Sequence, residues 1–100
     1  VQVFESQKDQ NLDQLAREYT SYMAQLNKYS NSLTYFQDTA LPQANWLEST
    51  ALKSYKAGEI EYVEMLQNAQ QAWQIREQYL QEILAYNQTV IQIETILGNE

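Results

Sequence analysis

The 100 residues of this chain include no cysteine and no histidine, which removes several kinds of chemistry at once. Without cysteine no disulfide or thiolate nucleophile can form, and without imidazole the usual ligands of zinc and copper are missing. We therefore expect no enzyme, no cofactor and no metal site of the soft or borderline kind. Glycine (two residues) and proline (one) are also scarce, which argues for helices and against a sheet with many turns.

Basic residues and long hydrophobic runs are scarce as well. Six lysines and arginines stand against thirteen acidic residues, so the formal net charge is −7. Nucleic acids and anionic membrane surfaces both select basic patches, so we expect neither as a partner. No apolar run approaches the roughly 18 residues of a transmembrane helix. The chain opens on Val1 without an initiator methionine, which we interpret as a fragment of a larger protein.

Apolar residues recur at alternating steps of three and four through the first half of the chain. This spacing has a 3.5-residue period, which is typical of a coiled-coil seam. Pro42 lies inside the pattern, and because proline lacks an amide proton we expect a kink there rather than a helix end. The pattern predicts one helix over about 7–57, capped near Ser6 and roughly 75 Å long. The seam positions are Leu12, Leu15, Tyr19, Tyr22, Leu26, Tyr29, Leu33, Phe36 and Ala40, followed by Ala44, Leu47, Ala51 and Tyr55.

Gly58 marks the only point at which both helical patterns break. Lys53 and Lys56 precede it and several glutamates follow it, which suits the dipoles of a helix that ends and of one that begins. A glycine just after a helix commonly takes a left-handed conformation. We therefore predict a turn at about 57–60 and a second helix over about 61–97. The expected fold class is all-α, a single long antiparallel helical hairpin.

The second helix carries a wider apolar face than the first, as suits a helix that touches more than one neighbour. Its main apolar positions are Leu66, Ala69, Trp73, Leu80, Ile83, Tyr86, Val90, Ile93 and Leu97, and Ile75, Tyr79, Leu84 and Ile91 widen the face. Folding the arms about residue 58 predicts the cross-arm pairs Ala51–Leu66, Leu33–Leu84 and Leu26–Ile91.

The same folding predicts an overhang at the start of the first helix. Leu12, Leu15 and Tyr19 would extend beyond the end of the second helix without a partner in the chain. Two isolated helices also bury little surface. We therefore expect the hairpin to self-associate, as a dimer or another bundle, or to pack against further chain.

Three glutamates near the turn, Glu59, Glu61 and Glu64, could be read as a catalytic or cation-binding cluster. They lie where helix starts favour acidic residues and where no buried pocket is expected, so we do not expect catalysis. Binding of a hard cation by these carboxylates is a minor alternative.

Residues 41–66 carry a recognisable pattern. It comprises Leu41-Pro42-Gln43-Ala44, then Tyr55-Lys56-Ala57-Gly58-Glu59-Ile60-Glu61-Tyr62 and Leu66, and the chain closes with Ile93-Glu94-Thr95-Ile96-Leu97-Gly98. The order and spacing resemble the C-terminal part of the TolC-like outer membrane efflux proteins, most closely the heavy-metal (CusC/CzcC-like) branch. The resemblance covers nearly the whole chain, and residues 41–66 give it its specificity.

The resemblance implies a periplasmic helical hairpin of an efflux channel in a tripartite export system, of the RND type for heavy metals or cations. In that family three chains form a tunnel, and the hairpin tips meet a periplasmic adaptor (membrane fusion) protein joined to an inner-membrane pump. Two positions would face the tunnel entrance: Glu64, and Gln67 where the family commonly has a second acid. The docking tip would comprise Tyr55, Lys56, Gly58, Glu59, Glu61 and Tyr62.

Two alternatives follow from the same residues. No strand pattern of a membrane barrel is present, and the first of the family's two repeats is missing. The parent could therefore be a separate outer-membrane channel or a pump polypeptide with a helical extension. The seam alone would also suit a generic coiled-coil oligomerisation or adaptor module. The tip discriminates between these classes, because a generic coiled coil does not need the Tyr55-x-x-Gly58 element.

Overall fold

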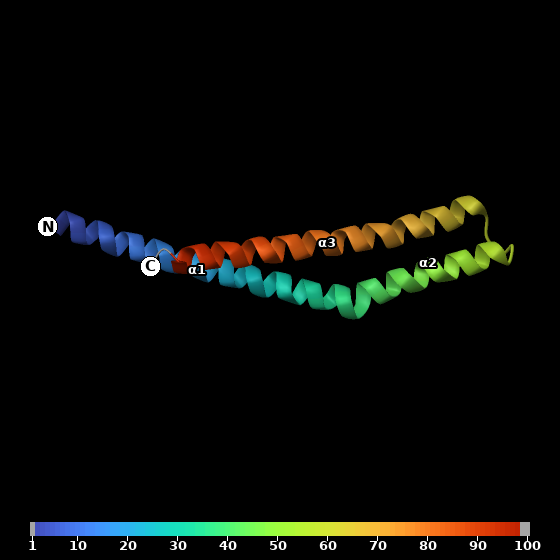
Figure 1. The fold of residues 1–100 in the computed structure, drawn as a ribbon, viewed down its shortest axis with the longest axis horizontal. Helices are drawn as coiled ribbons and strands as arrows, with labels where there is room; N and C mark the ends of the chain where they lie inside the picture. Colours follow the sequence, from blue (N-terminus) through green and yellow to red (C-terminus); the bar gives the residue numbers. More distant parts are fainter. Residues whose placement is uncertain (1, 99–100) are drawn as a thin grey trace.

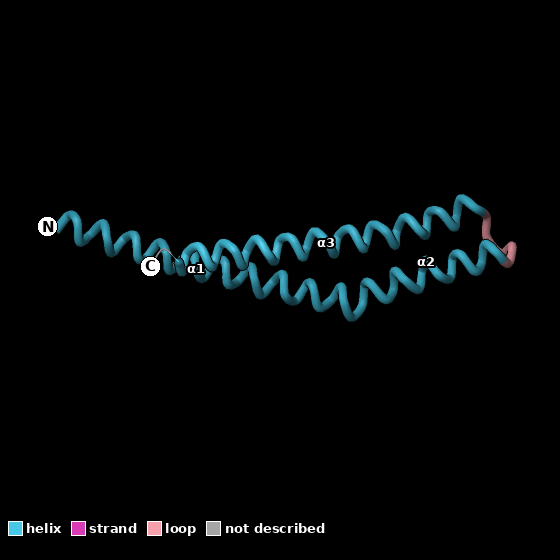
Figure 2. Tube along the Cα trace, in the orientation of Figure 1, coloured by secondary structure: helices cyan, strands magenta, loops and turns pink. Residues whose placement is uncertain are grey.

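The computed structural model describes the backbone of residues 2–98 and the side chains of residues 9–98. Its fold is an extended helical hairpin of 81 × 21 × 16 Å (Figure 1). The first arm joins α1 (Gln2–Tyr35), a π-helical turn η1 (Phe36–Ala40) and α2 (Leu41–Lys56) without a break. After a short turn, α3 (Tyr62–Gly98) returns antiparallel to the first arm (Figure 2). The described residues contain no strand, and the predicted all-α hairpin is confirmed.

The helix ends agree with the sequence patterns except at the start of the first arm. The end of α2 at Lys56 and the start of α3 at Tyr62 lie within one residue of the prediction. In contrast, α1 begins at Gln2 and runs through Ser6, so the cap expected near Ser6 was wrong. Residues 2–8 contain neither glycine nor proline, so nothing in the backbone stops the helix from extending to Gln2.

Inward-facing positions of both arms follow a seven-residue repeat, as in a coiled coil. On α3 they are Met65, Ala72, Tyr79, Tyr86 and Ile93, and on the first arm they are Tyr22, Tyr29 and Phe36, then Ala44 and Ala51. A second set of buried or half-buried positions flanks this series. It includes Ala40 on the first arm, Thr89 and Ile96 on α3, and the half-buried pairs 68/69, 75/76 and 82/83 on α3 and 32/33 and 47/48 on the first arm. The seam predicted for the first arm is therefore confirmed over most of its length.

Small and large side chains alternate along the interface between the arms. Ala44 and Ala72 are completely buried, which requires the backbones to approach closely in the half of the hairpin near the turn. Farther from the turn, Phe36 packs against Tyr79 with 5.9 Å between ring centroids, and Gln37 Nε2 donates a hydrogen bond of 3.1 Å to the Tyr79 hydroxyl. The aromatic rings fill the wider space at η1.

The first arm bends at η1, immediately before Pro42 (Figure 1). The Leu41 amide donates to the Phe36 carbonyl, five residues back, instead of the four of an α-helix. Pro42 then occupies the first turn of α2, where its missing amide proton costs little. The predicted kink near Pro42 is confirmed, and the helix bends there without ending.

The apolar positions of α3 divide between two faces, which corrects the predicted pairing. Trp73 and Leu80 point outward, and so do Leu84 and Ile91, which were expected to meet Leu33 and Leu26. Leu66, the expected partner of Ala51, is 39% exposed. The seven-residue repeat that faces the first arm lies one residue earlier, at Met65, Ala72 and Tyr79.

The expected overhang of Leu12, Leu15 and Tyr19 is also corrected. All three line one shallow groove with Ile96 and Leu97 from the end of α3. Ile96 lies on the side of α3 that faces α1 and is nearly buried, so its side chain packs against this part of α1, whereas Leu12 at the far end of the groove is 53% exposed. The part of α1 before this groove extends past the end of α3 (Figure 1).

Candidate docking site at the tip of the hairpin

A Schellman turn closes the first arm at the tip. Gly58 has φ +76°, the left-handed conformation that favours glycine. Its amide donates to the Tyr55 carbonyl at 3.0 Å, and the Glu59 amide donates to the Ser54 carbonyl at 2.9 Å. These two bonds satisfy carbonyls that the end of α2 would otherwise leave without partners. The prediction that Gly58 ends the first arm in a left-handed conformation is therefore confirmed.

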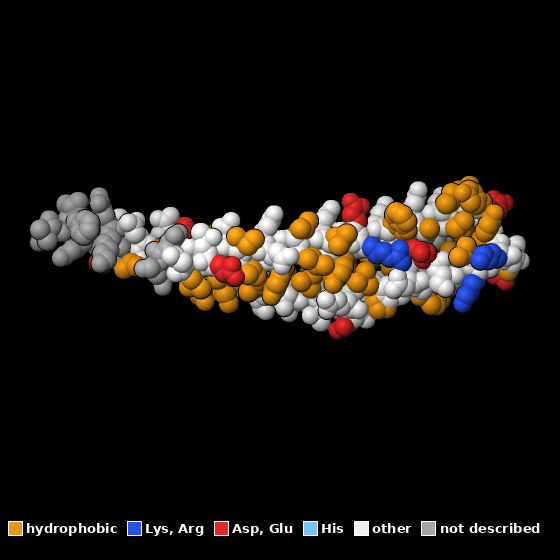
Figure 3. All heavy atoms as spheres, in the orientation of Figure 1, with side chains coloured by type: hydrophobic (Ala, Val, Ile, Leu, Met, Phe, Trp, Pro, Cys, Tyr) orange, Lys and Arg blue, Asp and Glu red, His pale blue; other side chains and the backbone are white. Residues whose placement is uncertain are grey.

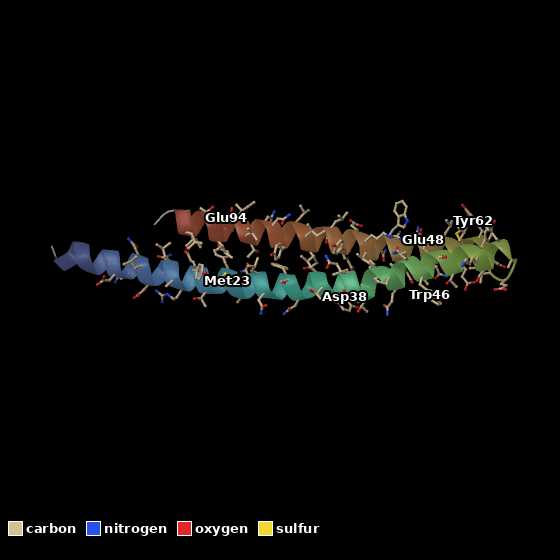
Figure 4. All side chains as sticks on the ribbon, turned by 60° about the horizontal axis from the view of Figure 1, so that its bottom comes forward. Met23, Asp38, Trp46, Glu48, Tyr62 and Glu94 are labelled. Carbon is tan, nitrogen blue, oxygen red and sulfur yellow. The ribbon has the colours of Figure 1, made fainter. Side chains whose placement is uncertain are left out.

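Two tyrosines bridge the arms just above this turn. The Tyr55 and Tyr62 rings lie 5.7 Å apart, centroid to centroid, with their planes inclined by 58°. Tyr62, from the first turn of α3, lies at the end of the hairpin (Figure 4). Both rings remain exposed, and Val63 beside them is exposed as well. The pair holds α2 and α3 together at the tip and offers a partner an aromatic surface.

The charged residues of the tip surround this aromatic pair. Lys53 and Lys56 occupy the last turn of α2, and Glu64 the first turn of α3, as the helix dipoles favour. Glu59 and Glu61 lie in the turn that connects α2 to α3, and both are exposed. The three glutamates do not form a group that could hold a metal ion, and no such group occurs among the described residues.

The other predicted site residues lie on the same end of the molecule. Lys56 is exposed next to the turn, and Glu64 and Gln67 are both exposed on the first two turns of α3. The structure thus brings the eight predicted tip and tunnel-facing residues together at one end. All eight are exposed.

An exposed hydrophobic stripe runs along most of α3, from near the tip to Ile91. We call it the α3 stripe: Leu66, Trp73, Leu80, Leu84 and Ile91, separated by seven, seven, four and seven residues. Trp73 is 69% exposed and separates two shallow grooves, one lined by Leu66, Ala69 and Gln70, the other by Leu80, Arg76 and Glu48. Hydrophobic side chains also gather over the start of α3 near the tip (Figure 3). The composition of α3 predicts this second apolar face, although its position was not predicted.

Arg76 makes the polar link between α2 and α3 that the sequence interpretation missed. Its Nη1 lies 2.6 Å from Glu48 Oε2, and its Nη2 donates to Asn45 Oδ1 at 2.8 Å. Glu48 lies between the arms, whereas Trp46 projects away from α3 (Figure 4). One signal could have revealed this link: Arg76 is the only basic residue after Lys56.

Comparison with known proteins adds no relative to these observations. No protein-family model, no curated protein and no solved structure matches the chain. Among the described residues, no helix has the length and hydrophobicity needed to cross a membrane.

Proposed function

We propose that this chain is the periplasmic helical hairpin of an efflux channel component in a tripartite export system for heavy metals or cations. In this proposal the hairpin is a passive conduit element that docks onto a periplasmic adaptor protein through its tip. The adaptor links it to an inner-membrane pump, and copies of the chain associate side by side. The parent protein would lie in the outer membrane or the cell envelope.

The exposed tyrosine pair over the Gly58 turn is the observation that carries this proposal. Tyr55 and Tyr62 remain exposed although hydrophobic residues of a self-sufficient hairpin would gain by turning inward. Tyrosine is common in protein interfaces because its ring supplies apolar area and its hydroxyl can bond to a partner. These residues belong to the tip pattern that resembles the efflux proteins.

The lack of a thick core supports a role inside a larger helical assembly. No large side chain among the described residues is completely buried, because two helices cannot enclose one. The α3 stripe leaves a second coiled-coil-like face without cover. Both features suit a hairpin that is one wall of a multi-helix structure.

A generic coiled-coil module is the second candidate, and the seven-residue repeat of the arms favours it. That repeat needs no docking tip, so the two candidates differ in what the tip should do. In the first, substitutions of tip side chains lower transport. In the second, the same substitutions leave every function intact as long as the arms pack.

The deciding experiment replaces Tyr55 and Tyr62 with alanine in the full-length gene product. We expect cross-linking to the adaptor and export of the substrate cation to fall while expression and helicity remain normal. Tyr35→Ala is the matched control, since Tyr35 is as exposed as Tyr62 but lies in the middle of the first arm. Normal export and docking by the double tip variant would reject the conduit proposal in favour of the generic module.

A further inference from the structure

The spacing of facing residues in the first arm contains one irregular step. Facing positions are seven residues apart in α1 (Tyr22, Tyr29, Phe36) and in α2 (Ala44, Ala51), but eight apart between Phe36 and Ala44. On α3 the spacing remains seven from Met65 to Ile93. The first arm therefore contains one residue more than the repeat that it pairs with.

The extra residue would break the interface if the arm were an uninterrupted α-helix. Eight residues at 3.6 per turn rotate the helix by about 80° beyond two full turns. Ala44 and Ala51 would then point to the side of α3, yet both are buried. A π-type turn contains an additional residue in each hydrogen-bonded ring, so it can absorb the excess.

We propose that η1 is a one-residue insertion in the seven-residue repeat, and that it resets the phase of the first arm and thereby bends it. The bond that defines the turn runs from the Leu41 amide to the Phe36 carbonyl and does not involve Pro42. Pro42 is accommodated after the turn without causing it. The bend sets the direction of the tip half, α2 with the start of α3, relative to α1. This inference is independent of the proposed function.

Deletion of Asp38, an exposed residue within η1, tests the inference directly. An uninterrupted helix would place Pro42 in its interior, where proline destabilises and kinks a helix, so the deletion is made in the Pro42→Ala chain. It should then restore an unbroken seven-residue repeat, so we expect the melting temperature to stay within about 5 °C of the Pro42→Ala chain. The control is deletion of Gln81, which is exposed on α3, where the repeat has no extra residue. This deletion rotates the half of α3 after residue 81 out of phase with the facing positions of the first arm. It should therefore lower the melting temperature by more than about 10 °C.

Residual dipolar couplings provide the structural readout, because they report the relative directions of the α1 and α2 axes. The Asp38 deletion in the Pro42→Ala chain should make the two axes collinear, and Pro42→Ala alone should leave the bend as it is. The inference is overturned if the Asp38 deletion destabilises the hairpin as strongly as the Gln81 deletion does. It is also overturned if the Asp38 deletion keeps the bend, or if Pro42→Ala removes it.

Discussion

At the scale of single residues, Gly58 illustrates a position that backbone geometry alone determines. Its φ of +76° lies in the left-handed region, and a Cβ built there would meet no atom within 4 Å. Steric crowding by neighbours therefore plays no part in the choice of glycine. Glycine is favoured because any residue with a Cβ is destabilised in the left-handed conformation.

We expect Gly58→Ala to lower the free energy of unfolding by about 1 kcal/mol, since only the left-handed conformation is penalised. Chemical denaturation monitored by circular dichroism measures this difference. Gly58→Asn is the control, because asparagine tolerates the left-handed region better and should cost less. Equal stability of all three chains would mean that the turn readily adopts another conformation.

Arg76 is a second residue whose local environment sets its contribution. The Arg76 and Glu48 side chains are 36% and 39% exposed, so water and salt screen their attraction. We expect Arg76→Gln to cost at most about 1 kcal/mol of stability, as for other exposed ion pairs. A double-mutant cycle with Glu48→Gln would measure the coupling, which should shrink in 1 M salt. A coupling that salt does not change would contradict this electrostatic interpretation.

At the scale of the elements, the sequence predicts the arms and the turn but not which face of α3 turns inward. The seam of the first arm stands out because polar residues surround it, and Gly58 interrupts both helical patterns. On α3 the series through Leu66 and Trp73 lies directly beside the series through Met65 and Ala72, and both are apolar. Packing decides between them: Ala72 fits where the backbones approach closely, and the large Trp73 ring does not.

Ala72→Leu tests how closely the helices approach near the tip. The position is completely buried, so three additional carbon atoms must push α2 and α3 apart. We expect a loss of about 1–3 kcal/mol in the free energy of unfolding, the usual cost of overpacking. Ala24→Leu, on an exposed position of α1, should change stability little by the same urea titration. A stable Ala72→Leu chain would show that the arms can separate at low cost.

The candidate site shows the same limit of sequence interpretation. Gly58 and the charges around it indicate the tip because their roles depend on local backbone geometry and on the helix dipoles. The contact between Tyr55 and Tyr62 depends on how α2 and α3 meet, so spacing alone does not reveal it. The link from Arg76 to Glu48 and Asn45 likewise needs the register of the two arms, which the extra residue in η1 alters.

At the scale of the whole molecule, the hairpin has more hydrophobic surface than its own interface uses. The predicted reason for association, an unpaired start of α1, no longer holds for Leu15 and Tyr19, which share a groove with the end of α3, and Leu12 alone of the three is still more than half exposed. The α3 stripe replaces the start of α1 as the surface through which we expect association. It is long, apolar and parallel to the existing seam, so another helix can pack along it.

We therefore expect the isolated chain to self-associate at micromolar concentration through the α3 stripe. Trp73→Glu places a charge at its most exposed residue and should shift the chain toward monomer in sedimentation equilibrium, by tenfold or more in the dissociation constant if burial of the ring is lost. Trp46→Glu is the matched control, since Trp46 is 68% exposed but lies on the outer side of α2. Association should then remain at the parent level. Equal weakening by both substitutions would indicate non-specific hydrophobic contact, and a monomeric parent chain would remove self-association from the proposal altogether.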